Sequence, residues 1–144
     1  MRPADIDAVM DLETRVYPFP WTRGNFIDSL AAGYAARLLR RPREHELLGY
    51  CIAMGGVDEM HLLNITVAPA HQRRGHGRFL LDDLVSRCRV AQASRLWLEV
   101  RESNATARAV YRHLGFREEG VRTGYYPAAG GREDAVVMSL AVSA

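Results

Sequence analysis

A glycine-containing loop between two regular elements is the feature that most constrains this fold. The loop at 72–78 follows a strand-like run at 60–67 and precedes an amphipathic helical run at 79–85. Gly75 and Gly77 allow a tight turn that brings backbone N–H groups close to a ligand. The first turn of a helix attracts phosphate because its N–H groups are unpaired and lie at the positive end of the helix dipole. Arginines in the same loop add charged donors, so the stretch predicts a pyrophosphate site.

Two common phosphate-binding loops are excluded by spacing. The dinucleotide fingerprint needs a third glycine where this chain has Leu80. The P-loop needs a lysine, and this chain contains none. The remaining pattern, Gln-x-x-Gly-x-Gly, is weak by itself, because a turn with a solvated arginine cluster would produce the same residues.

The bulk properties indicate an ordinary globular protein. A length of 144 residues, with 48% hydrophobic and 25% charged residues, predicts one domain spanning 1–144 with a real core. No apolar run approaches the roughly 20 residues that span a bilayer, and the segment 1–7 is too short and polar for a signal peptide. We therefore expect a cytoplasmic protein that does not enter a membrane.

Neither a metal site nor broad nucleic-acid binding is expected. Cys51 and Cys88 match no metal-ligand spacing and lie in apolar stretches, so both are expected to be buried thiols. A formal charge of +2 is too small for nucleic-acid binding across the whole surface. Arginine groups at 40–43 and 73–78 leave a local contact open.

Periodicity and turn residues predict an α/β fold with a mixed central sheet and helices on both faces. Thr22 and Asn104 are expected N-caps, and Gly115 is an expected C-terminal stop. A loop is expected at 126–131. The expected helices lie at 5–16, 22–30, 79–85 and 104–114, and the expected strands at 34–39, 47–54, 60–67, 95–100, 116–124 and 135–142.

Three residues of the second half suggest chemistry. Glu99 stands near the carboxyl end of a strand, where ligands collect in open sheets. Asn104 and Tyr111 are seven residues apart on one helix, so both lie on the same face. The alternative is structural: Glu99 would be a surface carboxylate facing Arg101, and Tyr111 an aromatic residue filling the helix face.

Eight short stretches form a pattern that runs along nearly the whole chain: 17–21 (YPFPW), 64–67 (NITV), 72–78 (QRRGHGR), 96–101 (LWLEVR), 103–105 (SNA), 111–116 (YRHLGF), 125–127 (YYP) and 131–135 (GREDA). In this order they resemble the GNAT superfamily of N-acetyltransferases. Within it they resemble the bacterial subgroup that acetylates the N-terminal alanine of the eighteenth small-subunit ribosomal protein. Family members usually begin with a strand, which here is short or missing because only three residues precede the first helical region.

The resemblance implies a GNAT acyl-CoA N-acyltransferase fold with acetyl-CoA as co-substrate. It implies Glu99 as general base and Tyr111 as general acid, with no metal. The residues implied to bind acetyl-CoA are Ile65, Thr66 and Val67 along the pantetheine arm, Arg73, Arg74, Gly75, His76, Gly77 and Arg78 around the pyrophosphate, and Asn104. The residues implied to line the acceptor groove are Tyr17, Trp21, Tyr125 and Tyr126.

The implied partner is a protein N-terminus, that of a ribosomal protein, and we expect a monomer. Two alternatives remain: a GNAT enzyme acting on another amine, such as a small molecule or a broader set of protein N-termini, and a CoA-binding module without catalysis. Three isolated histidines, His61, His71 and His76, are interpreted as structural or solvated and are not predicted to be bases.

Overall fold

The computed structural model describes residues 1–143 and contains a six-stranded mixed sheet. The helices are α1 (Ile6–Val16), α2 (Arg23–Ala31), α3 (His76–Val90) and α4 (Ala105–His113), with 3-10 turns at Pro3–Asp5 and Pro69–His71. The strands are β1 (Ala35–Arg40), β2 (Leu47–Gly55), β3 (Glu59–Val67), β4 (Arg95–Arg101), β5 (Arg117–Ala128) and β6 (Gly131–Ala141). The strand order is β1-β2-β3-β4-β6-β5, which confirms the expected mixed sheet.

The chain divides into two compact units. The first comprises Met1–Gly55 and Leu63–Ser86, and the second comprises Gly56–Leu62 and Arg87–Ala144. One domain over the whole chain therefore stays a prediction. Within the described part of the chain, no helix is both long and apolar enough to span a membrane.

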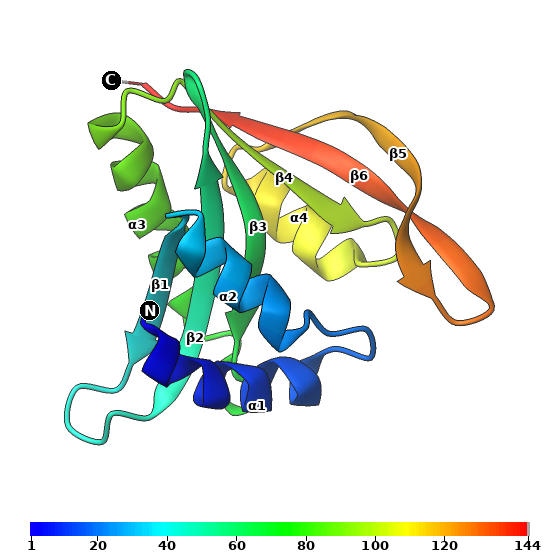
Figure 1. Ribbon diagram of the computed structural model, residues 1–144. Helices are drawn as coiled ribbons and strands as arrows, with labels where there is room; N and C mark the ends of the chain where they lie inside the picture. Colours follow the sequence, from blue (N-terminus) through cyan, green and yellow to red (C-terminus); the bar gives the residue numbers. More distant parts are fainter. Residues whose placement is uncertain (144) are drawn as a thin grey trace. The chain divides into compact units, whose positions relative to one another are not determined.

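In the first unit, α1 and α2 cover one face of the β1–β2 hairpin (Figure 1). Helix α1 buries Ile6, Val9 and Leu12, which recur every three residues and so form one stripe. They pack with Phe26 of α2 and with Tyr50 of β2. Two prolines follow α1 and prevent its continuation. The expected N-cap at position 22 is confirmed, since its hydroxyl accepts the Asn25 N–H at 3.1 Å.

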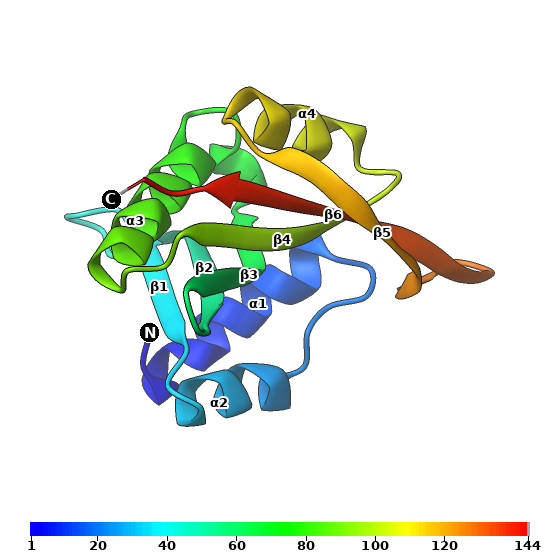
Figure 2. The ribbon, with the colours of Figure 1, turned by 90° about the horizontal axis from the view of Figure 1, so that it is seen from above.

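The other face of the same hairpin is covered by α3, which lies across β1 and β2 from α1 and α2 (Figure 2). Arg37 of β1 forms an ion pair with Asp83 of α3 at 3.3 Å. A Cβ built at Gly49 of β2 would stand 3.4 Å from the Leu80 side chain of the same helix and only 2.6 Å from the carbonyl oxygen of Thr66. Glycine is therefore required where β2 approaches the end of β3.

In the second unit, β3 pairs parallel to β4, and β4 and β5 each pair antiparallel to β6. Strand β4 alternates strictly: Leu96, Leu98 and Val100 are buried on one face. Trp97, Glu99 and Arg101 therefore share the opposite face. The expected cap of α4 is confirmed, because Asn104 accepts the Ala107 N–H at 3.2 Å, and the expected glycine stop adopts a left-handed φ of 104° at position 115.

One sequence prediction is wrong: the stretch 126–131 is not a loop. Strand β5 continues to Ala128 and β6 begins at Gly131, so Tyr126 pairs with Glu133 and Pro127 pairs with Arg132 (Figure 2). A proline is tolerated here because β5 is an edge strand. The prolines and glycines of this segment therefore mark a tight turn in a long hairpin.

The prediction of buried cysteines is confirmed: Cys51 and Cys88 are both buried, and burial raises the pKa of the Cys88 thiol. Helix α3 begins at His76, three residues earlier than expected. No strand precedes α1 within residues 1–143; instead the Met1 ammonium donates to the Ala36 carbonyl of β1 at 2.9 Å.

Candidate active site

In the first unit, the loop between β3 and α3 has the backbone that a phosphate site needs. Arg73 and Gly75 adopt left-handed φ values of 63° and 84°, which bend the chain sharply into the first turn of α3. Helix α3 has 15 residues, so its N-terminal N–H groups lie at the positive end of a full helix dipole. The side chains of Arg73, Arg74 and Arg78 are exposed. These residues fit a bound pyrophosphate.

Open space at the glycines supports the same fit. A Cβ built at Gly75 would meet nothing within 4 Å, and one at Gly77 would meet only Val67, at 3.8 Å. Nothing of the protein therefore fills the volume beside these two backbone positions. Gly77 has no left-handed φ to explain it, so its missing side chain leaves room for a close ligand.

The end of β3 is fixed by two side chains that bind its carbonyl groups. The Tyr17 hydroxyl donates to the Ile65 carbonyl at 3.1 Å and lies 2.8 Å from the Thr66 hydroxyl. The Gln72 amide donates to the Val67 carbonyl at 3.0 Å. Tyr17 is thereby brought together with Ile65 and Thr66, two of the three β3 residues predicted to pair with pantetheine, and Gln72 joins the third, Val67, to the loop.

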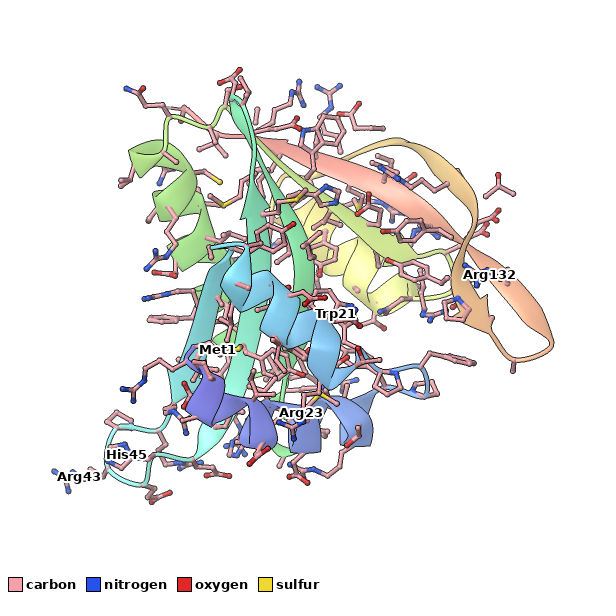
Figure 3. All side chains as sticks on the ribbon, viewed as in Figure 1. Met1, Trp21, Arg23, Arg43, His45 and Arg132 are labelled. Carbon is pink, nitrogen blue, oxygen red and sulfur yellow. The ribbon has the colours of Figure 1, made fainter. Side chains whose placement is uncertain are left out.

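A buried polar network centred on Glu13 holds the segment between α1 and α2. The Glu13 side chain, in a residue only 1% exposed, accepts the Trp21 backbone N–H at 2.9 Å and the Tyr50 hydroxyl at 2.6 Å. The Asn64 amide donates to the same carboxylate at 3.1 Å, and its oxygen accepts the Thr66 hydroxyl. Figure 3 marks Trp21 just before α2.

This network perturbs its two tyrosines. Burial is the main cause that raises the pKa of Tyr17, and the Glu13 charge adds to it. Burial and the hydrogen bond to Glu13 likewise raise the pKa of Tyr50. Both hydroxyls are therefore neutral donors. Glu13 was not among the predicted site residues, although a carboxylate on the apolar stripe of a helix was a visible signal.

In the second unit, Glu99 is a buried carboxylate rather than the surface group of the structural alternative. Its side chain is 6% exposed. The imidazole Nε2 of His61 contacts Glu99 Oε2 directly. The Nε of Arg122 lies 3.2 Å from Oε1, but not in hydrogen-bond geometry, and Oε1 has no hydrogen-bond partner among residues 1–143. Arg101 pairs instead with Glu133, at 3.0 Å.

Tyr125 and Tyr126 of β5 lie close to charged groups of this site. The rings of Tyr125 and Tyr126 meet edge to face at 4.9 Å, and the guanidinium groups of Arg122 and Arg101 lie over them at 5.4 and 4.5 Å. Burial is the main cause that raises the pKa of Tyr126, and Tyr125, Glu99 and Tyr111 oppose its ionisation further. Tyr126 therefore lies within electrostatic range of the predicted base and the predicted acid.

The motif at 131–135 holds this tyrosine segment in place. Arg132, marked in Figure 3, donates to the Gly124 and Tyr125 carbonyls, both at 2.9 Å. Asp134 accepts the Gly124 N–H at 2.8 Å. Glu133 accepts the Ser103 N–H at 2.8 Å just before α4, and the pKa of Glu133 is lowered first by the Ser103 side chain and then by this N–H.

Sequence reasoning missed two partners of Glu99. His61 was interpreted as structural or solvated, and Arg122 was not singled out. His61 is in register with Trp97 across the parallel β3–β4 pair, so it shares a face with Glu99. That pairing could be inferred only from the sheet. Among the described residues, no cluster of three or more His, Cys, Asp or Glu side chains could hold a metal ion.

Comparison with known proteins identifies the family. The model of the acetyltransferase (GNAT) family matches residues 6–116. The chain is 40% identical over 139 residues to the [ribosomal protein bS18]-alanine N-acetyltransferase of Salmonella typhimurium, covering 96% of this chain and 93% of the relative. It is 38% identical over 143 residues to the enzyme of the same name from Escherichia coli K12, covering 99% and 95%.

A solved structure agrees along the whole length. The crystal structure of the ribosomal-protein-S18-alanine N-acetyltransferase from Escherichia coli superposes with a TM-score of 0.91 at 38% identity, covering 100% of this chain and 92% of that one. The fold of this solved structure is therefore the one that carries the loop at 72–78, Glu99 and Tyr111 in this chain. The chain belongs to the acetyltransferase (GNAT) family.

Proposed function

We propose that this protein transfers the acetyl group of acetyl-CoA to the N-terminal α-amine of ribosomal protein bS18, at alanine. The observation that supports this most strongly is the near full-length identity of 38–40% to two enzymes named for that reaction. The buried carboxylate and the neighbouring tyrosines fit the chemistry. The proposal includes action as a monomer in the cytoplasm, where ribosomal proteins are made.

Acetyl-CoA supplies an activated thioester when it is bound. The exposed arginines of the loop and the first turn of α3 would bind its pyrophosphate through charged and backbone donors. Backbone groups at 65–67 would pair with the pantetheine arm. Asn104 would contact the co-substrate while its side-chain oxygen caps α4.

Amide formation requires two proton movements. An α-ammonium group has a pKa near 8, against roughly 10.4 for lysine, so little help is needed to expose its lone pair at neutral pH. Glu99 would take that proton, directly or through water. Tyr111 would protonate the departing thiolate. A backbone N–H near 65–67 would stabilise the oxyanion that develops on the thioester, and no covalent enzyme intermediate is needed.

Four aromatic residues would bind the acceptor. Tyr17 and Trp21 are fixed by hydrogen bonds in the first unit, and Tyr125 and Tyr126 are fixed in the second. Rigid tyrosines offer apolar area and a polar tip at low entropic cost, which suits the first residues of a peptide. A free small amine would leave most of this surface unused.

Mass spectrometry of one reaction tests the proposed function. The purified protein receives acetyl-CoA and either a peptide with the N-terminal sequence of bS18 or the same peptide with its α-amine blocked. We expect one acetyl group on the free peptide only. Self-labelling stays low because the chain contains no lysine.

The alternatives give different outcomes in the same assay. Faster turnover of a small amine than of the peptide, judged by kcat/KM, would replace the ribosomal substrate with a small molecule. Binding of acetyl-CoA without transfer to any amine would indicate a non-catalytic module. Binding of RNA that acetyl-CoA displaces, and that weakens steeply with salt, would indicate a nucleic-acid role for the loop arginines.

A further inference from the structure

We propose that the catalytic base is a His61–Glu99 pair, in which Glu99 orients the imidazole and Nδ1 of His61 takes the proton from the substrate ammonium. The inference rests on the proposed function and changes one step of it: the proton goes to His61 instead of Glu99, which orients the imidazole. No motif of the sequence pointed to His61. The contact of its Nε2 with Glu99 Oε2 places it directly beside the residue predicted to be the general base.

The contact selects the tautomer of His61. An ionised carboxylate only accepts hydrogen bonds, so the proton in the contact belongs to Nε2. In the neutral imidazole the other nitrogen, Nδ1, then holds a lone pair that can accept a proton. Glu99 is therefore placed to fix the ring orientation and the tautomer, as carboxylates do for histidine bases.

Glu99 itself is poorly placed to receive the proton. The His61 imidazole faces Oε2 and the Arg122 guanidinium faces Oε1, at 3.2 Å. The imidazole thus occupies Oε2, whereas Oε1 accepts no hydrogen bond from residues 1–143 and is flanked by the permanently charged Arg122. The Glu99 side chain is 6% exposed, whereas that of His61 is 23% exposed. The imidazole is thus the member of the pair that can exchange a proton with substrate, water or solvent.

Other charged and titratable groups of the second unit surround the pair. Arg122 of β5 approaches Glu99, and Arg101 of β4 lies over Tyr126 of β5. Tyr126, whose pKa is raised chiefly by burial, stays neutral, and Tyr111 of α4 is close enough to influence it. Histidine is the side-chain type of this cluster that most often acts as a general base.

The protons balance over one turnover. The substrate ammonium gives one proton to Nδ1, which turns the neutral imidazole into imidazolium while Glu99 stays ionised. The free amine then forms the N–C bond and the C–S bond breaks. The second proton lost from nitrogen ends on the thiol of CoA by way of Tyr111. The imidazolium finally releases its proton to water, which restores the pair.

His61 has two proposed roles, a hydrogen bond to Glu99 and acceptance of a proton. Replacing His61 by glutamine keeps the first role and removes the second. The Gln amide donates a hydrogen bond to Glu99 as Nε2–H does, but it cannot accept a proton at neutral pH. We expect His61→Gln to lower kcat at pH 8 by roughly 10²-fold. The ratio of wild-type to variant kcat, measured at saturating peptide and acetyl-CoA, should fall as the assay is made more acidic, because an imidazole that already carries a proton is not a base. Substrate amine ionisation cancels in this ratio.

A second variant makes the test independent of the fit of glutamine. His61→Ala should lose activity, and added free imidazole should restore it several-fold with the same pH dependence. His45→Gln is the matched control: it removes an exposed imidazole from the β1–β2 turn (Figure 3) and should leave kcat unchanged. Thermal melting and acetyl-CoA binding verify that each variant is folded.

The outcomes separate this inference from the proposed function. A ratio that stays constant with pH, together with no rescue by imidazole, would show that His61 only holds Glu99, and would overturn the pair. A wild-type protein that acetylates some other amine leaves the pair testable on that amine. A wild-type protein that acetylates no amine would overturn the proposed function and the pair together.

Discussion

At the residue scale, Glu99 is the side chain on which the proposed chemistry depends most directly. It is buried, contacts His61 and lies beside Arg122. Glu99→Gln keeps the shape but removes the charge that orients the imidazole. We expect kcat to fall by roughly 10²–10⁴, with the Kd for acetyl-CoA nearly unchanged. Steady-state kinetics measure kcat, and calorimetry measures the Kd. An unchanged kcat would show that Glu99 is not part of the catalytic base.

The individual site residues divide by how local their signal is. Glu99 and Tyr111 could be found from the sequence because each follows from a position within one element and from the family motifs. His61 could not, because its partner is 38 residues away and reaches it only across the β3–β4 pair. Arg122 likewise meets Glu99 from β5. Contacts across strands depend on register, which no local pattern gives.

At the element scale, caps and stops were predictable because each depends on a few neighbouring residues. Thr22, Asn104 and Gly115 all do what their types favour at helix ends. The hairpin of β5 and β6 was mispredicted because its turn residues are paired by cross-strand hydrogen bonds. Arg132 and Asp134 also bind the Gly124 segment across the hairpin, and a local sequence pattern does not show such contacts.

The connection between α1 and α2 depends on the buried Glu13, which accepts three hydrogen bonds. Glu13→Gln replaces the oxygen that accepts the Trp21 N–H by an amide donor, so this N–H loses its hydrogen bond. We expect the free energy of unfolding to fall by about 1–3 kcal/mol and the KM for the peptide to rise more than the KM for acetyl-CoA, because Trp21 is released.

Tyr50→Phe is the matched control for that prediction. It removes one hydrogen bond to Glu13 but leaves the bond to the Trp21 N–H. It should therefore reduce stability without raising the KM for the peptide selectively. Urea unfolding and steady-state kinetics compare the two variants. Equal effects on both KM values in Glu13→Gln would mean that the network does not position the acceptor segment.

At the scale of the whole molecule, fold class and sheet type followed from the sequence, but the two compact units did not. Strand β3 belongs to both, with Glu59–Leu62 in one unit and Leu63–Val67 in the other. Alternate residues are buried along its whole length, although the buried residues change from Met60 and Leu62 to the polar Asn64 and Thr66. The period of burial therefore gives no sign of the division.

The stability of the molecule should depend on pH through Asp5, which joins the N-terminus to β1. Its carboxylate accepts the Arg2 N–H at 2.7 Å and the Arg40 guanidinium at 3.0 Å. The Arg2 hydrogen bond is the first cause that lowers the pKa of Asp5, and Arg40 contributes further. Because the folded pKa lies below the unfolded value near 3.9, the stabilisation is complete above that value and is lost as the pH falls through the folded pKa.

Asp5→Asn should therefore reduce the free energy of unfolding by about 1 kcal/mol at pH 7, and the difference from wild type should shrink as the pH falls toward 3. Asp11→Asn, in an exposed pair with Arg15 at 3.4 Å, is the control and should change stability little at pH 7. Urea unfolding of the three proteins at both pH values gives the comparison. Acidification removes the charge of the Asp5 carboxylate. A stability difference between wild type and Asp5→Asn that is equally large at both pH values would therefore mean that this charge does not cause the difference.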